Sequence, residues 1–174
     1  MNTKHALLVV DVQVDMFYED EAVFGAVELL ENLHKVIEKA RVSKTPVFFV
    51  RNSGGPGQPD EHGTPGWELH PEFYPQPGEF IFNKNHGNAF KETPLQAWLI
   101  ELGVTHLVLC GLQSEYCIAD TCQGALDLGY QVTVVADAHS TLDAGEKTAA
   151  EIIVEQNEKF AQIAGIVLVE DLKF

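Results

Sequence analysis

Short runs of consecutive apolar residues restrict the fold of this chain more than any other feature. Residues 6–10 read Ala-Leu-Leu-Val-Val, and residues 106–110 read His-Leu-Val-Leu-Cys. Such runs lack the apolar–polar alternation of a half-exposed strand, so they are typical of strands buried on both faces, as in a parallel sheet. Shorter runs of the same kind predict four further strands, at residues 46–50, 79–82, 131–135 and 166–169.

Segments with the period of a helix separate these strands. In residues 25–44, apolar side chains recur three and four positions apart, which predicts an amphipathic helix. Further helices are predicted at residues 93–103, at residues 143–164 and directly after the polar turn at 113–115. Alternating strands and helices predict an α/β fold with three layers, α-β-α, around a central six-stranded, mainly parallel sheet joined by right-handed crossovers.

Length and charge restrict the domain count and the partners. A chain of 174 residues is long enough for one well-buried domain and short for two, so residues 1–174 are predicted to form a single domain. The chain has 11 basic and 26 acidic residues, whereas nucleic acids and anionic membranes favour a basic surface, so neither is expected as a partner. Three cysteines without paired spacing predict no disulfide framework.

The absence of a bilayer-spanning apolar run and of a signal-peptide pattern favours a soluble, cytoplasmic protein.

Three predicted strands lead into residues that can perform chemistry. Asp11 directly follows the first strand, Lys84 lies just past the third, and Cys117 lies beyond the fourth. Taken singly, these residues are most simply a turn residue, a surface charge and a small buried apolar residue. All strands of a parallel sheet end at one edge, however, so an acid, a cation and a thiol are expected to meet there. This convergence makes Cys117 a candidate nucleophile.

The segment around Cys117 supports the same interpretation. Gly111 ends the strand, a polar turn follows at 113–115, and Cys117 falls in the predicted first turn of the next helix. There the unpaired N–H groups and the positive end of the helix dipole favour a thiolate and can stabilise an oxyanion. Cys110, inside the strand, and Cys122, about one helical turn farther on, are predicted to be core residues.

Residues 51–78 form a long segment rich in glycine and proline. A loop of this length within a compact domain is usually functional, so it is predicted to be a lid or a pocket wall. His62 and His70 raise the alternative of a zinc site, but their spacing matches no ligand motif, and Arg51 is an unfavourable neighbour for a cation. No Gly-x-Gly-x-x-Gly or P-loop pattern follows the first strand, so dinucleotide binding and phosphoryl transfer have little support.

Three stretches resemble segments of the isochorismatase-like cysteine hydrolases, a family that includes nicotinamidases and N-carbamoylsarcosine amidohydrolase. They are VVDVQVDMF at the first strand, FNKNHGNAF around Lys84, and CGLQSEYCIADTCQGALDLGYQVTVVADAHST. The likeness covers nearly the whole chain, and its most specific part is the G-x-x-x-x-Y-C segment with the Ala-Asp-Ala that follows. It implies the isochorismatase-like, Rossmann-like topology.

The resemblance implies a catalytic triad of Asp11, Lys84 and Cys117. Asp11 would take the thiol proton and later pass it to the leaving amine, while Lys84 would stabilise the thiolate and orient the aspartate. Cys117 would attack a carbonyl carbon and form a thioester, which water then hydrolyses. The resemblance also implies a cis peptide bond between Leu112 and Gln113, and an oxyanion hole formed by the backbone N–H groups of Gln113 and Cys117.

Two departures from the family patterns narrow the expected chemistry. Nicotinamidases carry an acidic metal-binding motif after the second strand, where residues 51–53 of this chain read Arg-Asn-Ser, so neither a metal nor another cofactor is expected. Isochorismatases proper cleave a vinyl ether and often have glycine at the cysteine position, so Cys117 favours hydrolysis of a C–N bond in a small amide, ureido or carbamoyl compound. The stretch GTPGWELHP resembles the lid of the metal-free amidases, with Trp67 and Phe17 as apolar pocket walls. Tyr116, next to Cys117 in the sequence, is the third expected substrate contact.

Two other functions stay open at this point. An isochorismatase-type enzyme would release pyruvate rather than ammonia. A non-enzymatic, small-molecule-binding α/β protein would carry the triad residues without an activated thiol.

Members of the family are commonly dimers or tetramers, and the loop from Trp67 to Tyr74 is more aromatic than a lone lid should expose. A homo-oligomer is therefore expected.

Overall fold

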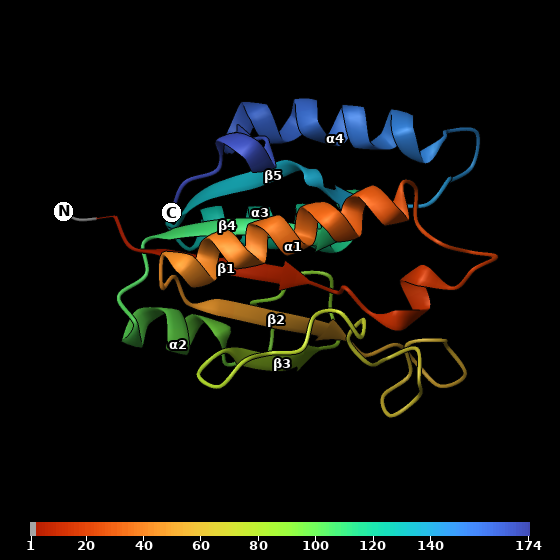
Figure 1. Ribbon diagram of the computed structural model, residues 1–174, viewed down its shortest axis with the longest axis horizontal. Helices are drawn as coiled ribbons and strands as arrows, with labels where there is room; N and C mark the ends of the chain where they lie inside the picture. Colours follow the sequence, from red (N-terminus) through yellow and green to blue (C-terminus); the bar gives the residue numbers. More distant parts are fainter. Residues whose placement is uncertain (1–2) are drawn as a thin grey trace.

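The computed structural model describes residues 3–174 and has a central sheet with helices on both sides (Figure 1). Six strands form the sheet in the order β3-β2-β1-β4-β5-β6, and every neighbouring pair is parallel. The strands are β1 (His5–Val10), β2 (Val47–Asn52), β3 (Phe80–Lys84), β4 (His106–Leu112), β5 (Gln131–Ser140) and β6 (Gly165–Val167). The predicted three-layer α/β fold with six strands is confirmed.

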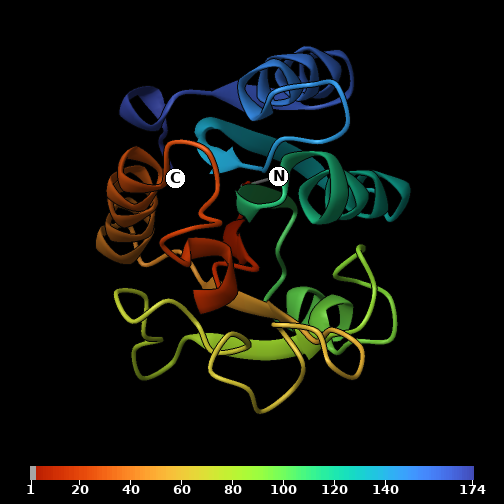
Figure 2. The same ribbon diagram turned by 90° about the vertical axis from the view of Figure 1, so that its right-hand side faces the viewer.

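The two faces of the sheet are covered by different helices. The helices are α1 (Ala26–Val42), α2 (Leu95–Glu101), α3 (Ala119–Asp127) and α4 (Ala149–Ile163). The end-on view shows α1 on one face and α2, α3 and α4 on the other (Figure 2). Leu7 and Val9 of β1 pack in the apolar cluster under α1, and Leu8 and Val10 pack in the cluster on the opposite face. Both faces of β1 are therefore buried, which explains its continuous apolar run.

The ends of several elements differ from the sequence predictions. Helix α4 begins only after Thr148, whose side chain accepts a hydrogen bond from the N–H of Glu151 while the Glu151 side chain accepts one from the N–H of Thr148. This reciprocal cap fixes the start of the helix. Strand β5 continues to Ser140, where it still pairs with β4. In the first turn of α1, Leu29 is buried with the apolar stripe, whereas Val27 is 75% exposed.

The long segment between β2 and β3 packs against the residues that follow β1. The N–H of His70 donates to the carbonyl of Val12 at 2.9 Å, and the N–H of Asp15 donates to the carbonyl of Gly66 at 3.1 Å. These bonds hold the loop beside the carboxyl ends of the strands. The predicted pocket wall therefore lies where parallel sheets bind their ligands.

Most aromatic surface of this loop is buried within the chain. Trp67 and Phe73 are 6% and 2% exposed, whereas Tyr74 is 70% exposed. Of these three aromatic residues, which suggested contact with a second copy of the chain, Tyr74 alone is exposed. The homo-oligomer stays a prediction.

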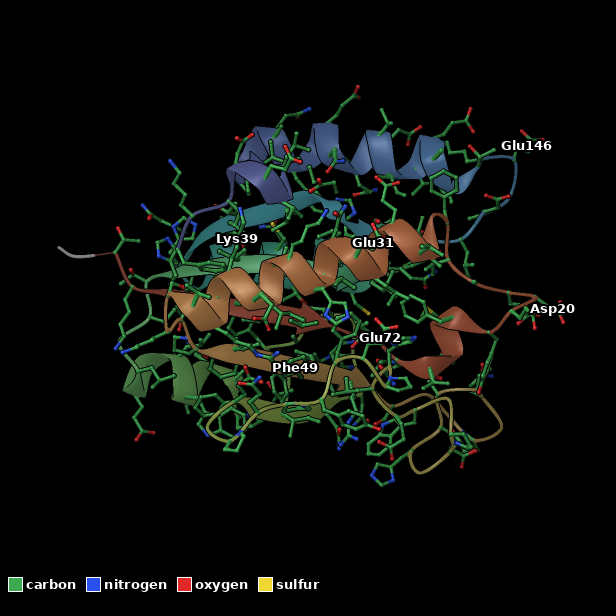
Figure 3. The ribbon with its side chains drawn as sticks, in the orientation of Figure 1. Asp20, Glu31, Lys39, Phe49, Glu72 and Glu146 are labelled. Carbon is green, nitrogen blue, oxygen red and sulfur yellow. The ribbon has the colours of Figure 1, made fainter. Side chains whose placement is uncertain are left out.

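Charged side chains lie at both ends of the molecule. Figure 3 shows Asp20 and Glu146 extending into solvent at the end where the strands finish. Lys39 lies at the opposite end, where its Nζ donates to the carbonyls of Val169 and Leu172 at 2.6 and 3.1 Å. Within residues 3–174, no helix has both the length and the hydropathy needed to cross a membrane.

Candidate active site

Asp11, Lys84 and Cys117 meet at the carboxyl edge of the sheet. The Nζ atom of Lys84 lies 2.7 Å from Asp11 Oδ2. It also donates hydrogen bonds to Cys117 Sγ and Asn52 Oδ1, both at 3.1 Å. The Lys84 side chain is fully buried and the Asp11 side chain is 9% exposed. The three N–H donors of the ammonium are therefore shared among a carboxylate, a thiol and an amide.

The strands position Asp11 and Lys84. Asp11 follows β1 with a left-handed φ of 50°, and its N–H donates to the carbonyl of Val50 on the neighbouring β2 at 2.9 Å. Lys84 is the last residue of β3 and lies opposite Asn52 in the β2–β3 register. Strand β3 is two strands away from β1, so the link must cover roughly 10 Å. The long Lys84 side chain, the Asp11 side chain and the 2.7 Å contact between them together span that distance.

A single π-helical turn, Ser114–Ile118, carries Cys117 and leads directly into α3. The N–H groups of Tyr116 and Ile118 both donate to the carbonyl of Gln113 at 3.2 Å. The sequence predicted that Cys117 lies in the first turn of the α-helix, and this placement is wrong. The chain widens into a π-helical turn before α3 begins, a feature that occurs frequently at functional sites.

The end of β4 brings this turn close to β1. Gly111 has a φ of 116°, and a side chain at this position would collide with the carbonyl of Val10, so the position requires glycine. The Leu112–Gln113 peptide bond is cis, as the family resemblance implied. Within residues 3–174 the N–H of Gln113 donates to no backbone carbonyl. Gln113 and Cys117 both line the cavity at the triad, so their N–H groups are candidates for binding an oxyanion.

Burial and neighbouring charges set the protonation states of the triad. Burial raises the pKa of the Cys117 thiol to about 12; the Asp11 carboxylate adds to the rise, and Lys84 opposes it. Burial also raises the pKa of Asp11 against the opposing effect of Lys84. The pKa of Lys84 is raised, because Asp11 and Cys117 outweigh the lowering by burial. The resting site therefore holds a neutral thiol, a lysine cation and a carboxylate of increased basicity, and the thiol requires a base to become a nucleophile.

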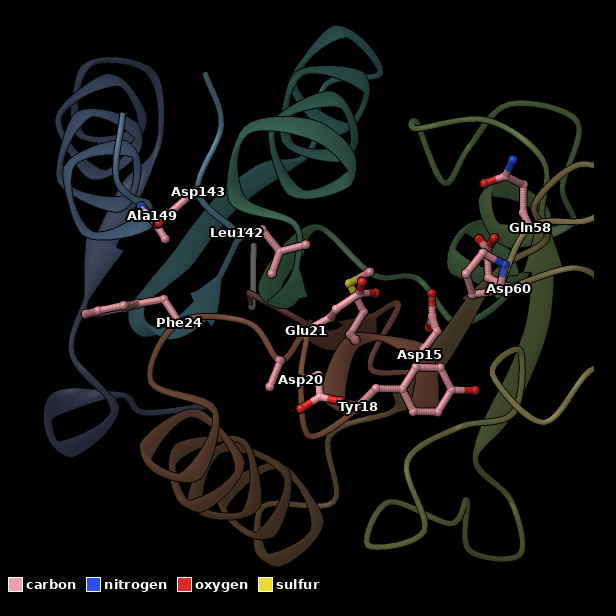
Figure 4. Close-up of a pocket in the computed structure, with 13 residues that line it drawn as sticks. Asp15, Tyr18, Asp20, Glu21, Phe24, Gln58, Asp60, Leu142, Asp143 and Ala149 are labelled. Carbon is pink, nitrogen blue, oxygen red and sulfur yellow. Dashed lines mark hydrogen bonds between the residues drawn. The ribbon is translucent and has the colours of Figure 1, made fainter. Parts of the chain in front are cut away.

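Two adjoining cavities lie at this edge of the sheet. The inner pocket, of about 90 Å³, is lined by Asp11, Gln13, Asp15, Met16, Asn52, Asp60, Leu112, Gln113 and Cys117. The outer pocket, of about 720 Å³, shares Asp15, Met16 and Asp60 with it (Figure 4). The inner pocket has room for a small reacting group, and the outer pocket has room for the remainder of a larger molecule.

The three predicted substrate contacts line neither pocket. Trp67 is buried beneath Arg51, whose Cζ lies 3.6 Å from the ring centroid, and its indole N–H donates to Ser53 Oγ at 3.1 Å. Phe17 packs against the ring of His70 with 4.8 Å between the centroids. Tyr116 is 55% exposed. Packing within the loop holds Trp67 and Phe17, and the role of all three residues as substrate contacts stays a prediction.

Asn52 is a site residue that the sequence analysis did not single out. Its Oδ1 accepts from Lys84 at 3.1 Å, and its Nδ2 donates to Asp60 Oδ2 at 2.7 Å. The buried Gln13 side chain holds the Asn52 backbone through both its N–H and its carbonyl, at 2.7 and 2.9 Å. Asn52 is the last residue of β2, so the rule that found Asp11 and Lys84 at strand ends also applies to it.

A buried polar network supports the π-helical turn. Ser114 Oγ lies 2.7 Å from His139 Nδ1, and His139 Nε2 lies 2.9 Å from Asn157 Oδ1. Burial lowers the pKa of His139, which keeps the ring neutral near physiological pH. Ser114 and His139 are 0% and 3% exposed, so the network holds the turn that carries Cys117.

The two loop histidines pack against different aromatic rings. His62 packs against the ring of Trp67 with 4.2 Å between the centroids, and His70 packs against Phe17. Among the described residues, no three His, Cys, Asp or Glu side chains cluster as a metal site would require. Both histidines therefore have a packing role.

Comparison with known proteins places this geometry in context. The Isochorismatase domain family matches residues 5–164. A streptothricin hydrolase from Streptomyces noursei is 42% identical over 138 residues, which is 79% of this chain and 50% of that protein. The chain spans about half the length of this curated relative.

Solved structures give the same result for the fold. The crystal structure of an isochorismatase from Pseudomonas putida KT2440 has a TM-score of 0.91 at 30% identity, over 97% of this chain and 89% of that one. N-carbamoylsarcosine amidase from Thermoplasma acidophilum has a TM-score of 0.86 at 26% identity, over 99% of this chain and 100% of that one.

Proposed function

Because this chain belongs to the isochorismatase family, we propose that it is a hydrolase that uses Cys117 to cleave the C–N bond of a small amide, ureido or carbamoyl compound. One observation carries the proposal. A thiol that requires a base lies 3.1 Å from a lysine ammonium, which in turn lies 2.7 Å from a buried carboxylate. This is the arrangement of nucleophile, charge stabiliser and base that covalent acyl transfer needs.

The reaction begins with proton transfer. Asp11 Oδ1 is buried and has no hydrogen-bond partner among the described residues, so it is free to accept the proton of the Cys117 thiol. The raised pKa of Asp11 increases its strength as a base. Lys84 stays protonated and stabilises the thiolate that forms.

The thiolate then attacks the carbonyl carbon of the substrate. A C–S bond forms, and the carbonyl electrons move to oxygen, where the N–H groups of Gln113 and Cys117 stabilise the charge. Collapse of this intermediate breaks the C–N bond as Asp11 returns its proton to the leaving nitrogen. Water, deprotonated by Asp11, then hydrolyses the thioester and releases the acid and the free thiol.

The thiol and the named relatives both support cleavage of a C–N bond. A vinyl ether is cleaved by protonation and addition of water and requires no thiol, whereas acyl transfer from nitrogen requires a nucleophile. N-carbamoylsarcosine amidase is an amidase by name, and it is similar to this chain over its whole length. These points favour ammonia or an amine as the leaving group.

A substrate panel tests the proposal. Streptothricin, N-carbamoylsarcosine and simple primary amides and ureides should be assayed for release of ammonia or amine, with isochorismate assayed for pyruvate. The expected result is turnover of at least one C–N substrate and a thioester adduct on Cys117, seen as an added acyl mass on the intact protein. Pyruvate release without C–N cleavage would reassign the chain to the vinyl-ether branch. If no substrate is turned over and iodoacetamide labels Cys117 no faster than a free thiol, the chain is not a cysteine hydrolase.

A further inference from the structure

Five carboxylates surround the outer pocket. They belong to Asp15, Asp20, Glu21, Asp60 and Asp143, and we call this group the acidic vestibule. Figure 4 shows Asp15 and Asp60 on one side of the hollow and Asp143 across from them. The vestibule adjoins the inner pocket, because Asp15 and Asp60 line both cavities. A substrate held at Cys117 and larger than the inner pocket would therefore extend past these side chains.

Among residues 3–174, no cationic side chain balances the vestibule. No lysine, arginine or histidine is among the described residues that line either pocket. None of the five carboxylates forms an ion pair within residues 3–174. Asp60 and Asp143 accept neutral hydrogen bonds, from Asn52 Nδ2 and from the N–H of Ala149, each at 2.7 Å. The negative charge is thus held in place and left for a ligand to neutralise.

Two buried oxygens lack a donor. Asp11, with a side chain only 9% exposed, and Asp15 each keep an Oδ1 atom that is buried and has no partner among the described residues. Both residues line the inner pocket. Burial, reinforced by Asp60, raises the pKa of Asp15 to about 6. A buried acceptor without a partner in the protein is a place where a ligand can donate. Asp11 Oδ1, the base of the proposed mechanism, would meet the scissile nitrogen, and Asp15 Oδ1 is left for a donor on the cationic end of the ligand.

The arrangement suits an organic cation better than a metal ion. No group of three or more His, Cys, Asp or Glu side chains among the described residues is close enough to hold a metal. The vestibule carboxylates instead surround a cavity of about 720 Å³. Charges spread around a space of this size can pair with an ammonium or guanidinium group on a flexible chain.

We propose that the substrate is a cationic amide: its scissile carbonyl lies in the inner pocket against Cys117, and its ammonium or guanidinium group lies in the acidic vestibule near Asp15 and Asp60. This inference rests on the proposed hydrolase function and specifies its substrate class. Asp60 is the main specificity determinant, because the bond from Asn52 fixes it between the two pockets.

Three matched amides test the proposal by turnover. 5-Aminopentanamide, hexanamide and adipamate carry an ammonium, a methyl group and a carboxylate, respectively, at the same distance from the carboxamide. At low ionic strength the cation should be hydrolysed with a kcat/KM about tenfold or more above that of the neutral amide, and the anion should be the poorest substrate. Added salt should reduce the difference. Asp60→Asn and Asp15→Asn should each reduce it, whereas Glu101→Gln, at the exposed end of α2, removes one charge elsewhere and should not.

A binding measurement separates this inference from the proposed function. Met16 lines both pockets and is one of two methionines in the chain, so its methyl group can be observed after labelling with [methyl-13C]methionine. In Cys117→Ser protein, 5-aminopentanamide should shift the Met16 signal at concentrations where hexanamide and adipamate do not.

The outcomes are distinguishable. Shifts caused by the cation alone, without ammonia release from any amide by the unmodified protein, would support the vestibule and contradict the hydrolase function. Equal turnover of all three amides, with no preference in the Met16 shifts, would support the hydrolase function and overturn the vestibule. Ammonia release by the unmodified protein, with a cation preference that falls in Asp60→Asn and persists in Glu101→Gln, would support both.

Discussion

The Nζ atom of Lys84 lies 3.1 Å from the Sγ atom of Cys117, although 33 positions separate the two residues in the sequence. A lysine ammonium at this distance stabilises a thiolate once it forms, yet burial keeps the pKa of the resting thiol at about 12. The cation therefore does not ionise Cys117 by itself. The proposed mechanism therefore needs the second contact of Lys84, with Asp11.

Removal of the thiol should stop turnover. Cys117→Ser should keep its fold and lower kcat by about a thousandfold or more, because a hydroxyl is a far poorer nucleophile at neutral pH. Turnover and melting temperature should be measured on the same preparation. Cys122→Ser, which removes a buried thiol of α3 that does not line the pocket, is the matched control and should retain activity. Near-normal activity of Cys117→Ser would exclude a covalent mechanism through this residue.

Removal of the base should be as severe as removal of the nucleophile. Asp11→Asn keeps the shape of the side chain and removes the proton acceptor, so turnover should fall to a level similar to that of Cys117→Ser. The double variant should be little worse than either single variant, because residues that act as one unit are not additive. A normal rate per folded molecule in Asp11→Asn would reduce Asp11 to a turn residue.

Asn52 should position the cation. Asn52→Ala removes the Oδ1 acceptor of Lys84 and the Nδ2 donor to Asp60. A hydrogen bond to a charged group contributes about 1.5–3 kcal/mol, so kcat/KM should fall about tenfold to a hundredfold. The pH–rate profile should also shift, since a less constrained Lys84 changes the pKa of Asp11. A drop in melting temperature with unchanged kinetics and pH profile would assign Asn52 a structural role only.

Chelation should not affect the enzyme. Arg51 and Asn52, the last two residues of β2, occupy the positions where an acidic ligand would be needed, and the loop histidines pack on aromatic rings. Activity should therefore be unchanged after prolonged dialysis against a chelator. Loss of activity that zinc restores would show that His62 and His70 have been misinterpreted.

Asp15 should make stability depend on pH. Its pKa is raised from 3.8 to about 6, with burial as the largest cause and the charge of Asp60 as the second. A carboxyl group with a raised pKa in the folded state destabilises the fold when it ionises, so stability is lost as pH rises through the interval between these two values. Asp15→Asn should therefore raise the melting temperature at about pH 8 and leave it unchanged at about pH 3.5.

The expected gain is small. Asp15 is partly exposed, so solvent screening limits the effect to roughly 1 kcal/mol. Unfolding curves of the wild type and of Asp15→Asn across this pH range provide the measurement. Asp20→Asn, at an exposed neighbouring position, is the matched control. A constant difference at all pH values would show that Asp15 ionises normally in the folded protein.

The fold class was predictable because periodicity is a local property. Continuous apolar runs such as residues 6–10 report burial on both faces of a strand, and a stripe three to four residues apart reports one buried face of a helix. Chain order then implies a parallel sheet, and a parallel sheet has a single carboxyl edge. Asp11, Lys84 and Cys117 could be selected from the sequence on this basis alone.

Only the tertiary structure decided how these residues meet. The strand order places β3 two strands away from β1, and the length of the Lys84 side chain closes that gap. The π-helical turn at Cys117 follows β4, which approaches β1 closely at Gly111. That approach joins segments about a hundred residues apart, and no local pattern reports it. Intrinsic secondary-structure propensity acts over a few neighbouring residues, so it cannot predict this contact.

The residues that line the pockets could not be predicted from the sequence for a related reason. Trp67 and Phe17 are apolar and lie near the site in the chain, yet packing directs their rings into the loop, while Asp15 and Asp60 become the walls. A loop has no period that tells which side its residues face, and its conformation follows from contacts with distant segments. The sequence therefore determined the sheet and the residues at its edge, and long-range packing determined the shape and the charge of the space in front of them.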